Sequence, residues 1–382
     1  MGLFVAAALL LLWVLVGWPL WLAWRARRRP RSVRKSEIFP TVSVIIPVRN
    51  GAAYLGRKLE SVLALDYPAN LLEVLVVSDG STDATESVAE SFSARGVRLL
   101  RRPARGKPAA LNAALQLVSG EIVVFTDVRQ PLEPASLRRL VACFADPEVG
   151  AASGELRIMQ GDNSAEAAIG VYWRFESWIR RSLSQIDSMF GATGPFYAMR
   201  RSLVRPLPEE VLLDDVFLPM NAFFHGFRLV VEPEAIAWDY PTSLRSEFRR
   251  KVRTLAGNYQ LLRYYPQLLG TRNRLWLDYV SYKLGRLALP FLLIMLFAGS
   301  LRLPEAWRSV ALAAQAAGYL LAAADPLVPE HFMLKRLTAP GWTFLTMMAA
   351  ALLALQVWFV PPQRLWVVTE ARIKEPSGSE RT

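Results

Sequence analysis

Short apolar runs alternate with amphipathic stretches from about residue 41 to residue 161. The runs cover residues 42–47, 73–77, 97–100 and 121–126 and are rich in Val, Ile and Leu, as buried strands of a parallel sheet are. The stretches between them carry apolar residues at helical spacing. This alternation predicts an α/β, Rossmann-like domain with a mostly parallel sheet wrapped by helices.

Two longer amphipathic helices are predicted after this region, over residues 164–188 and 244–262. Each has an apolar stripe at spacings of three and four residues, with arginines beside it. Such a helix suits the edge of a protein core, and it suits the surface of a bilayer equally well. The sequence leaves both interpretations open.

Four further segments are apolar enough to suggest membrane spans: residues 2–24, 282–301, 309–324 and 342–360. The third is short and rich in alanine, so it also fits a packed hairpin arm. A cleaved signal peptide is the alternative for residues 2–24. The missing positive n-region and the absence of a small-residue cleavage site before the arginines favour a retained span.

The chain has 382 residues, a net charge of +12 and 53% hydrophobic residues, and this combination favours a membrane protein over a soluble nucleic-acid binder. The basic segment after the first span predicts a cytoplasmic end beside an anionic leaflet. Three later spans would put the C-terminus outside, whereas Arg364, Arg372 and Lys374 favour the inside. The single cysteine, Cys143, excludes an internal disulfide, and with only two histidines a structural zinc site is not expected.

Charged residues collect where three of the predicted strands end. Asp79, then Arg105 with Lys107, then Asp127 occupy successive strand exits. Ligands bind at the carboxyl ends of strands in open α/β sheets, and glycine beside lysine before a helix suits phosphate. No G-x-G-x-x-G follows either of the first two strands, which disfavours a dinucleotide cofactor. For Asp127 the alternative is a loop aspartate that caps a helix starting near Pro131.

Four segments in order, Ile-Pro-Val-Arg-Asn at 46–50, Ser-Asp-Gly-Ser-Thr-Asp at 78–83, Arg-Gly-Lys at 105–107 and Asp127, closely resemble the inverting family 2 glycosyltransferases of the GT-A fold. The resemblance runs from about residue 41 to residue 260. It implies a nucleotide-sugar donor, with the uridine near Asp79 and the diphosphate near the basic helix start. It also implies that Asp127 begins a D-x-D motif that binds Mg²⁺ or Mn²⁺. The donor-side residues that it implies are Pro47, Arg49, Asp79, Lys107, Asp127, Arg129 and Arg253.

The D-x-D motif departs from the family pattern, because the chain reads Asp127-Val128-Arg129. A guanidinium cannot bind a metal ion, but it can pair with a phosphate through two hydrogen bonds. Two outcomes are open. Either Asp127 and the diphosphate hold the metal alone, or Arg129 takes over part of the work of the metal.

On the acceptor side, Leu213-Asp214-Asp215 looks like the T-E-D motif of the family, which makes Asp215 the base and Asp214 its neighbour. The alternative for Asp214 is a helix cap. The family places an acceptor-side loop at residues 190–196, which contains Gly191 and Gly194. Residues 250–254 stand at its Q-x-x-R-W motif, where Arg250 replaces the glutamine and Thr254 the tryptophan, so that only Arg253 carries over. A basic helix face against anionic lipid is the other interpretation.

The sequence thus predicts a multi-pass protein of the cell membrane with a cytoplasmic catalytic domain, which transfers sugar from a nucleotide donor, such as a UDP-sugar, to a growing polysaccharide. The alternatives are a single transfer to a lipid carrier and a non-catalytic nucleotide-sugar-binding subunit of a synthase complex. Besides the donor, the expected partners are the acceptor and the lipid bilayer, and no nucleic acid. The predicted parts are an N-terminal span (1–24), a basic linker (25–40), a donor-binding half (41–160), an acceptor-side half (161–240), an amphipathic interface segment (241–281) and a C-terminal region of about three spans with a tail (282–382).

Overall fold

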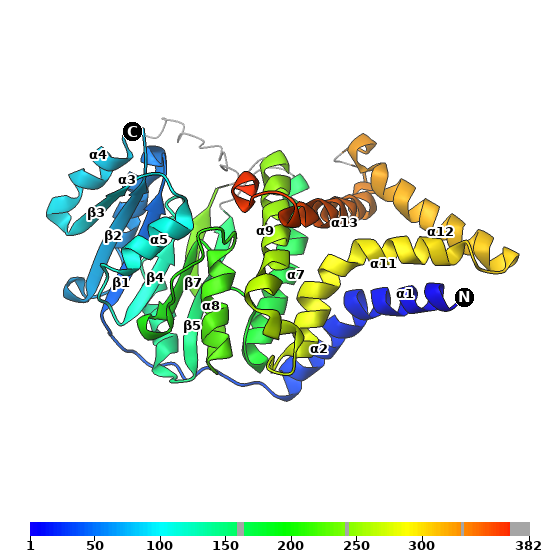
Figure 1. The fold of residues 1–382 in the computed structure, drawn as a ribbon, viewed down its shortest axis with the longest axis horizontal. Coiled ribbons are helices and arrows are strands. Elements are labelled where there is room, and N and C mark those ends of the chain that lie inside the picture. Colours follow the sequence, from blue (N-terminus) through cyan, green and yellow to red (C-terminus); the bar gives the residue numbers. More distant parts are fainter. Residues whose placement is uncertain (159–163, 241–243, 330–331, 367–382) are drawn as a thin grey trace. The chain divides into compact units, whose positions relative to one another are not determined.

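The computed structural model describes residues 1–158, 164–240, 244–329 and 332–366, without the side chains of residues 158–173 and 244–246. The chain divides into two compact units, one built around a β-sheet and one helical (Figure 1). Within the described residues, the helical unit comprises residues 1–29, 164–182, 244–329 and 332–366, and the sheet unit comprises residues 30–158 and 183–240.

The sheet has seven strands, which lie in the order β3-β2-β1-β4-β6-β5-β7. The strands are β1 (Val42–Val48), β2 (Leu72–Asp79), β3 (Val97–Arg102), β4 (Ile122–Thr126), β5 (Val149–Ile158), β6 (Phe196–Arg200) and β7 (Arg228–Asp239). β6 runs antiparallel to its neighbours β4 and β5, and the other pairs are parallel. The predicted mostly parallel sheet is confirmed, and β1 to β4 coincide with the four predicted strands.

Helices cover both faces of this sheet. They are α3 (Ala52–Leu63), α4 (Thr85–Ser91), α5 (Lys107–Leu115), α6 (Ser136–Ala142) and α8 (Asp214–Phe224), together with the end of α7 (Ser164–Ile186). Val44 and Ile46 of β1 belong to one buried cluster with Leu59 of α3 and Leu140 of α6. Ile45, which points to the opposite face, is equally buried. The burial of both faces explains why these strands are continuous apolar runs.

The helical unit contains long helices joined by short π-helical and 3₁₀ turns. Its helices are α1 (Gly2–Leu12), α2 (Trp18–Arg28), α9 (Leu244–Tyr264), α10 (Trp276–Tyr279), α11 (Gly285–Ser300), α12 (Glu305–Ala323) and α13 (Lys335–Ala354), with the first part of α7. Among the described residues, three helices are long and apolar enough to cross a membrane: Gly2–Arg28, Trp276–Ser300 and Lys335–Trp358. α12, at the short span predicted for residues 309–324, does not meet that standard. Arg372 and Lys374 lie outside the described residues.

The basic segment that follows the first helix is paired with carboxylates of the protein. In the helical unit, Arg25 lies 2.6 Å from Asp278, which is buried. In the sheet unit, three cations of the segment have acidic partners: Arg31 with Glu148 (2.8 Å), Arg34 with Asp146 (3.3 Å) and Lys35 with Glu232. The fold itself thus engages four of these cations, and the position of this segment beside an anionic leaflet stays a prediction.

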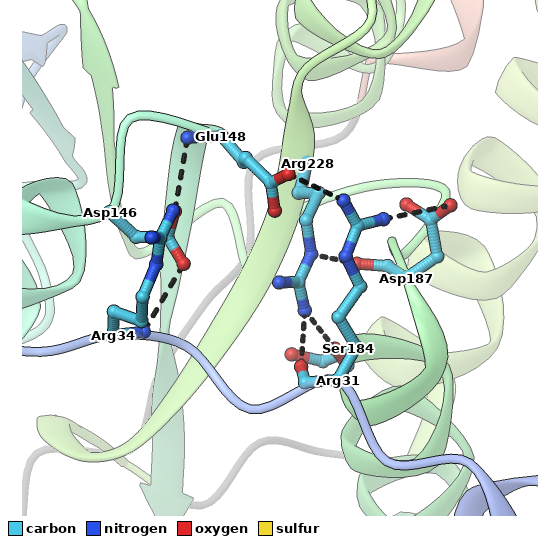
Figure 2. A network of polar contacts seen from close by, with 7 residues as sticks. All are labelled: Arg31, Arg34, Asp146, Glu148, Ser184, Asp187 and Arg228. Atoms are coloured by element: carbon cyan, nitrogen blue, oxygen red, sulfur yellow. Dashed lines mark hydrogen bonds and ion pairs between the residues drawn. The ribbon is translucent and has the colours of Figure 1, made fainter.

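Arg228, the first residue of β7, fixes this segment to the sheet unit (Figure 2). Its side chain is buried, and its guanidinium donates to three backbone carbonyl oxygens: those of Asp187 (2.8 Å), Arg31 (2.8 Å) and Ser184 (3.0 Å). Burial lowers the pKa of Arg228 from its ordinary value, and the neighbouring Arg31 adds to this effect. The charge is tolerated because carbonyl dipoles from three places in the chain converge on it.

Candidate active site

Asp79, the last residue of β2, holds the turn in front of α5. Its buried carboxylate accepts hydrogen bonds from the backbone amides of Arg105 (2.8 Å) and Gly106 (2.9 Å). Gly80 has a φ of +66°, and a Cβ there would lie 2.6 Å from the nitrogen of Ala104, so this close approach requires glycine. The carboxylate therefore sets the position of Lys107 at the start of α5, and its contact with the uridine stays a prediction.

Lys107 links two carboxylates from distant parts of the chain. Its Nζ lies 2.9 Å from Oδ1 of Asp127, just beyond β4, and 3.2 Å from Oδ1 of Asp214, at the start of α8. Burial alone would lower the pKa of Lys107, but the two carboxylates outweigh burial and raise the pKa above its ordinary value. The lysine is thus a fixed cation in the site. Tyr197 on β6 completes the group, because its hydroxyl donates to Oδ2 of Asp214 at 3.4 Å.

Asp214 and Asp215 are the first two residues of α8, where the positive end of the helix dipole stabilises carboxylates. The N-cap residue is Leu213, so the interpretation of Asp214 as the helix cap is wrong. The backbone of Asp215 accepts a hydrogen bond from Ala192 N at 2.7 Å. A Cβ on Gly194 would lie 3.0 Å from Oδ2 of Asp215. The acceptor-side glycine loop therefore packs directly against the carboxylate of the expected base.

The alternative for Asp127 is also wrong, because the helix expected near Pro131 begins at Ser136. Arg129, two residues after Asp127, forms a two-point ion pair with Asp239 at the end of β7. Its Nε and Nη2 each lie 3.1 Å from a carboxylate oxygen, and its side chain is only 13% exposed. Two of the three guanidinium nitrogens are thus engaged by the protein. That Arg129 binds the donor diphosphate stays a prediction.

The loops after β1 and β2 are tied together by Asn50. This residue has a φ of +52°, its Oδ1 accepts a hydrogen bond from Thr82 N (2.8 Å), and its own N–H donates to Ser81 Oγ (3.1 Å). Pro47 and Arg49 precede it at the same strand exit, where Pro47 is half-buried and Arg49 exposed. The position of Arg49 suits a contact with the donor, which the structure leaves as a prediction.

Arg250 and Arg253 lie on α9, in the helical unit, and are described within that unit alone. Arg250 pairs with Glu247 at 2.7 Å, one helical turn away. The guanidinium of Arg253 lies 4.7 Å from the ring centre of Trp366, a cation–π distance. The two arginines therefore have partners within their own unit, and their roles in binding the donor and the acceptor stay predictions.

The residues near Asp127 fit a metal ion only as a partial ligand set. Among the described residues, no group of three or more His, Cys, Asp or Glu side chains is placed to hold one. Asp127 is a half-buried carboxylate at the exit of β4, and 36% of its side chain is exposed. An ion there would take one ligand from the protein and the rest from a diphosphate and water, an arrangement that Mg²⁺ accepts. Asp127 can thus supply one ligand to the predicted metal, and which of the two outcomes holds stays a prediction.

Sequence reasoning missed three residues beside the site: Lys58, Tyr197 and Asp239. Lys58 had a visible signal, because it lies three residues after Leu55 and four before Val62 on the apolar stripe of α3. A charged residue on a buried stripe indicates an internal partner. Burial lowers the pKa of Lys58 to about 7, and Asp127 acts in the opposite direction. Tyr197 and Asp239 had no such signal, since their strands had not been predicted.

Residues 43–207 match the profile of Glycosyl transferase family 2. The matched segment holds Asp79, Lys107 and Asp127 at three strand exits of the sheet. Residues 43–207 therefore form a family 2 glycosyltransferase domain with a GT-A fold.

A solved structure of the mannosyltransferase PcManGT from Pyrobaculum calidifontis, in complex with GDP-Man and Mn²⁺, is similar to this chain along almost its whole length. The TM-score is 0.71 and the identity 25%, and the match covers 94% of this chain and 99% of that one. The similarity therefore includes helices on both sides of the family domain.

Curated proteins that are similar to this chain carry the names of different sugar transferases. A probable glycosyltransferase, YdaM of Bacillus subtilis, is 24% identical over 65% of this chain and 62% of its own length. A beta-monoglucosyldiacylglycerol synthase of Synechocystis is 26% identical over 66% and 55%, and an N-acetylglucosaminyltransferase of Rhizobium is 29% identical over 66% and 61%. The chain thus spans less than two thirds of each of these relatives.

Proposed function

We propose that this chain is a membrane-bound, inverting glycosyltransferase that moves a sugar from a nucleotide donor, such as a UDP-sugar, to a growing polysaccharide. The observation that carries the proposal is the position of Lys107, which binds Asp127 from the exit of β4 and Asp214 from the start of α8. Asp215, the next residue, lies against the glycine loop. Lys107, a cation suited to a diphosphate, and Asp215, a carboxylate suited to accept a hydroxyl proton, thus lie in the same unit, with Asp214 between them in contact with Lys107.

In this mechanism the acceptor hydroxyl attacks the anomeric carbon from the face opposite the nucleotide. The carbon–oxygen bond to the acceptor forms as the bond to the diphosphate breaks, and the hydroxyl proton passes to Asp215. An aspartate is a weak base in water, with a pKa of ~3.9, but the hydroxyl becomes acidic only in the transition state. Lys107 stabilises the charge that grows on the departing diphosphate. A divalent ion, held through Asp127, would supply further charge stabilisation there.

The second candidate is a single sugar transfer to a membrane lipid. It is supported by the similarity to the Synechocystis protein named beta-monoglucosyldiacylglycerol synthase. Thr254, which stands where the family motif has a tryptophan, also favours this candidate over a chain-extending synthase. The helices apolar enough to span a membrane suit both, because a polymer and a lipid acceptor both require a membrane.

The deciding experiment supplies membranes that contain the chain with labelled UDP- and GDP-sugars and measures the size of the product. Long labelled polymer supports the polysaccharide proposal, and one sugar in the lipid extract supports the lipid candidate. If purified protein releases no nucleotide from any donor in the presence of native membrane extract, the chain is instead a non-catalytic binding subunit.

Chelation is expected to remove activity. EDTA should stop transfer, and added Mn²⁺ or Mg²⁺ should restore it, because Arg129 is already paired with Asp239 and replaces the metal charge poorly. Asp127→Asn should raise the metal concentration at half-maximal activity. The matched control is Glu209→Gln, which removes an exposed carboxylate that pairs with Arg105. Unchanged turnover in EDTA would instead assign the leaving-group charge to Arg129.

Three spans, with the sheet unit in the cytoplasm, would return the chain to the cytoplasm after α13. A cysteine in place of the exposed Gln363 should then react with a membrane-impermeant maleimide only after cells are permeabilised. A cysteine in place of the exposed Arg302, between the second and third spans, should react in intact cells. The native Cys143 is buried and gives no background. Labelling at position 363 in intact cells would show that α12 is a fourth span.

A further inference from the structure

A lysine side chain lies inside the sheet unit, beneath the strand that leads to Asp127. Lys58 of α3 has an exposed fraction of 0%. Its ammonium donates hydrogen bonds to Thr126 Oγ1 at 2.6 Å and to the backbone oxygen of Gln130. These two acceptors stand immediately before Asp127 and three residues after it. The ammonium therefore holds both ends of the short segment that carries Asp127.

Lys58 holds Gln130 by its backbone. Gln130 is 2% exposed, and its Oε1 has no hydrogen-bond partner within the part of the chain that the structure describes. Its backbone oxygen, in contrast, accepts from the ammonium of Lys58 and helps to fix this end of the segment. Since a buried ammonium without acceptors is costly, Lys58 and the two acceptors stabilise each other only in this geometry.

The hydroxyl of Thr126 connects Lys58 to the glycine loop through two hydrogen bonds. Its Oγ1 accepts from Lys58, which has no acceptor capacity, so the hydroxyl proton points to the backbone oxygen of Pro195 at 2.7 Å. Pro195 follows Gly194, which lies close to Asp215. A Cβ added to Gly194 would be 3.0 Å from Oδ2 of that carboxylate. Lys58 is thereby connected through one hydroxyl to the loop that packs on Asp215.

We propose that Lys58 is a positioning residue, whose buried ammonium fixes the Asp127 segment and the Gly194–Pro195 loop relative to each other. The inference rests on the proposed roles of Asp127 and Asp215. Lys58 acts on the two aspartates through the hydrogen bonds of its ammonium to Thr126 and Gln130. A shift of about 1 Å at either aspartate is enough to lower a catalytic rate by ~10²-fold.

The test uses the full chain in detergent with three variants. Lys58→Met keeps the length of the side chain and removes the donor, Thr126→Val removes the shared hydroxyl, and Thr126→Ser retains it. The value of kcat is expressed per nucleotide-binding site. Lys58→Met and Thr126→Val should each lower it by about 10–100-fold, while Thr126→Ser should stay near the wild type. Because both losses break one connection, the double variant should be little worse than either single variant.

Leu59→Ala is the matched control, because Leu59 is the next residue of α3 and is also 0% exposed. It should lower thermal stability by creating a cavity and leave kcat per binding site unchanged. If Lys58→Met and Leu59→Ala lower kcat equally, Lys58 is only a structural residue and the proposal fails. Should Lys58→Met not fold, Thr126→Val and Thr126→Ser decide the same question.

A readout without turnover separates this inference from the proposed function. Amide hydrogen exchange of residues 127–130 and 191–195 should accelerate in Lys58→Met and Thr126→Val but not in Leu59→Ala. If exchange accelerates and the wild type transfers no sugar, the positioning is real and the transferase proposal has failed. If exchange in both segments is unchanged, Lys58 does not connect them, whatever the activity.

Discussion

Asp215→Asn is expected to lower the rate of sugar transfer by roughly 10²–10⁴-fold, the contribution typical of a positioned general base. The amide has nearly the shape of the carboxylate, so the glycine loop that lies against it should keep its place. What is lost is the ability to accept the proton of the acceptor hydroxyl. Binding of the free nucleotide should stay within a few-fold of the wild type, because Lys107 contacts Asp127 and Asp214, both unchanged.

The measurement compares initial rates at saturating donor with the affinity for UDP and GDP, on protein of equal purity. Asp214→Asn is the informative control. It removes a buried partner of both Lys107 and Tyr197, so it should lower stability and disturb nucleotide binding together. If Asp215→Asn turns over at nearly the wild-type rate, another group is the base.

Arg228→Met should destabilise the folded chain by about 3–5 kcal/mol, because it leaves one buried and two part-buried carbonyl oxygens without this donor. Methionine fills a similar volume, so the loss reports hydrogen bonds rather than a cavity. The segment held by Arg228 includes the carbonyl of Arg31, and its detachment should also increase proteolytic cleavage near residues 30–35. The rate of thermal inactivation in detergent measures the first effect, and limited proteolysis measures the second.

Arg31→Gln is the control for Arg228. The backbone oxygen of Arg31 still accepts from Arg228, and what is lost is the pairing of a half-exposed side chain with Glu148 (2.8 Å) and Asp187 (3.9 Å). Such surface pairs contribute about 0–1 kcal/mol, so inactivation should change little. Equal losses in the two variants would show that the side chain of Arg31, and not the buried guanidinium, anchors the segment.

The sequence predicted the first half of the sheet well and the second half poorly. β1 to β4 are apolar runs because they are buried on both faces, which is the pattern that hydrophobicity reveals. β5 contains Gly150 and Gly154, where a Cβ would lie 2.6 Å from Phe227 and 2.5 Å from Phe196. Tight packing thus required small residues, and small residues leave no apolar run to detect.

The candidate site shows the same division. Lys107, Asp127 and Asp214 were chosen from motifs, and the structure brings them together. Arg129 pairs with Asp239, a residue that was not predicted because β7 was not, and its contact with the donor stays a prediction. A sequence reveals which residue is charged, but the partner depends on strands that meet only in the folded sheet.

The reversed strand β6 has a consequence for synthesis on the ribosome. β4 is synthesised long before its neighbour β6. Ile122 of β4 pairs with Arg200 of β6, and α7 and β5 lie between these strands in the chain. At ~5–20 residues per second, the apolar flank of β4 stays uncovered for seconds of translation. Fragments that stop short of Phe196 should therefore aggregate, whereas those that extend through Asp239 contain every strand of the sheet.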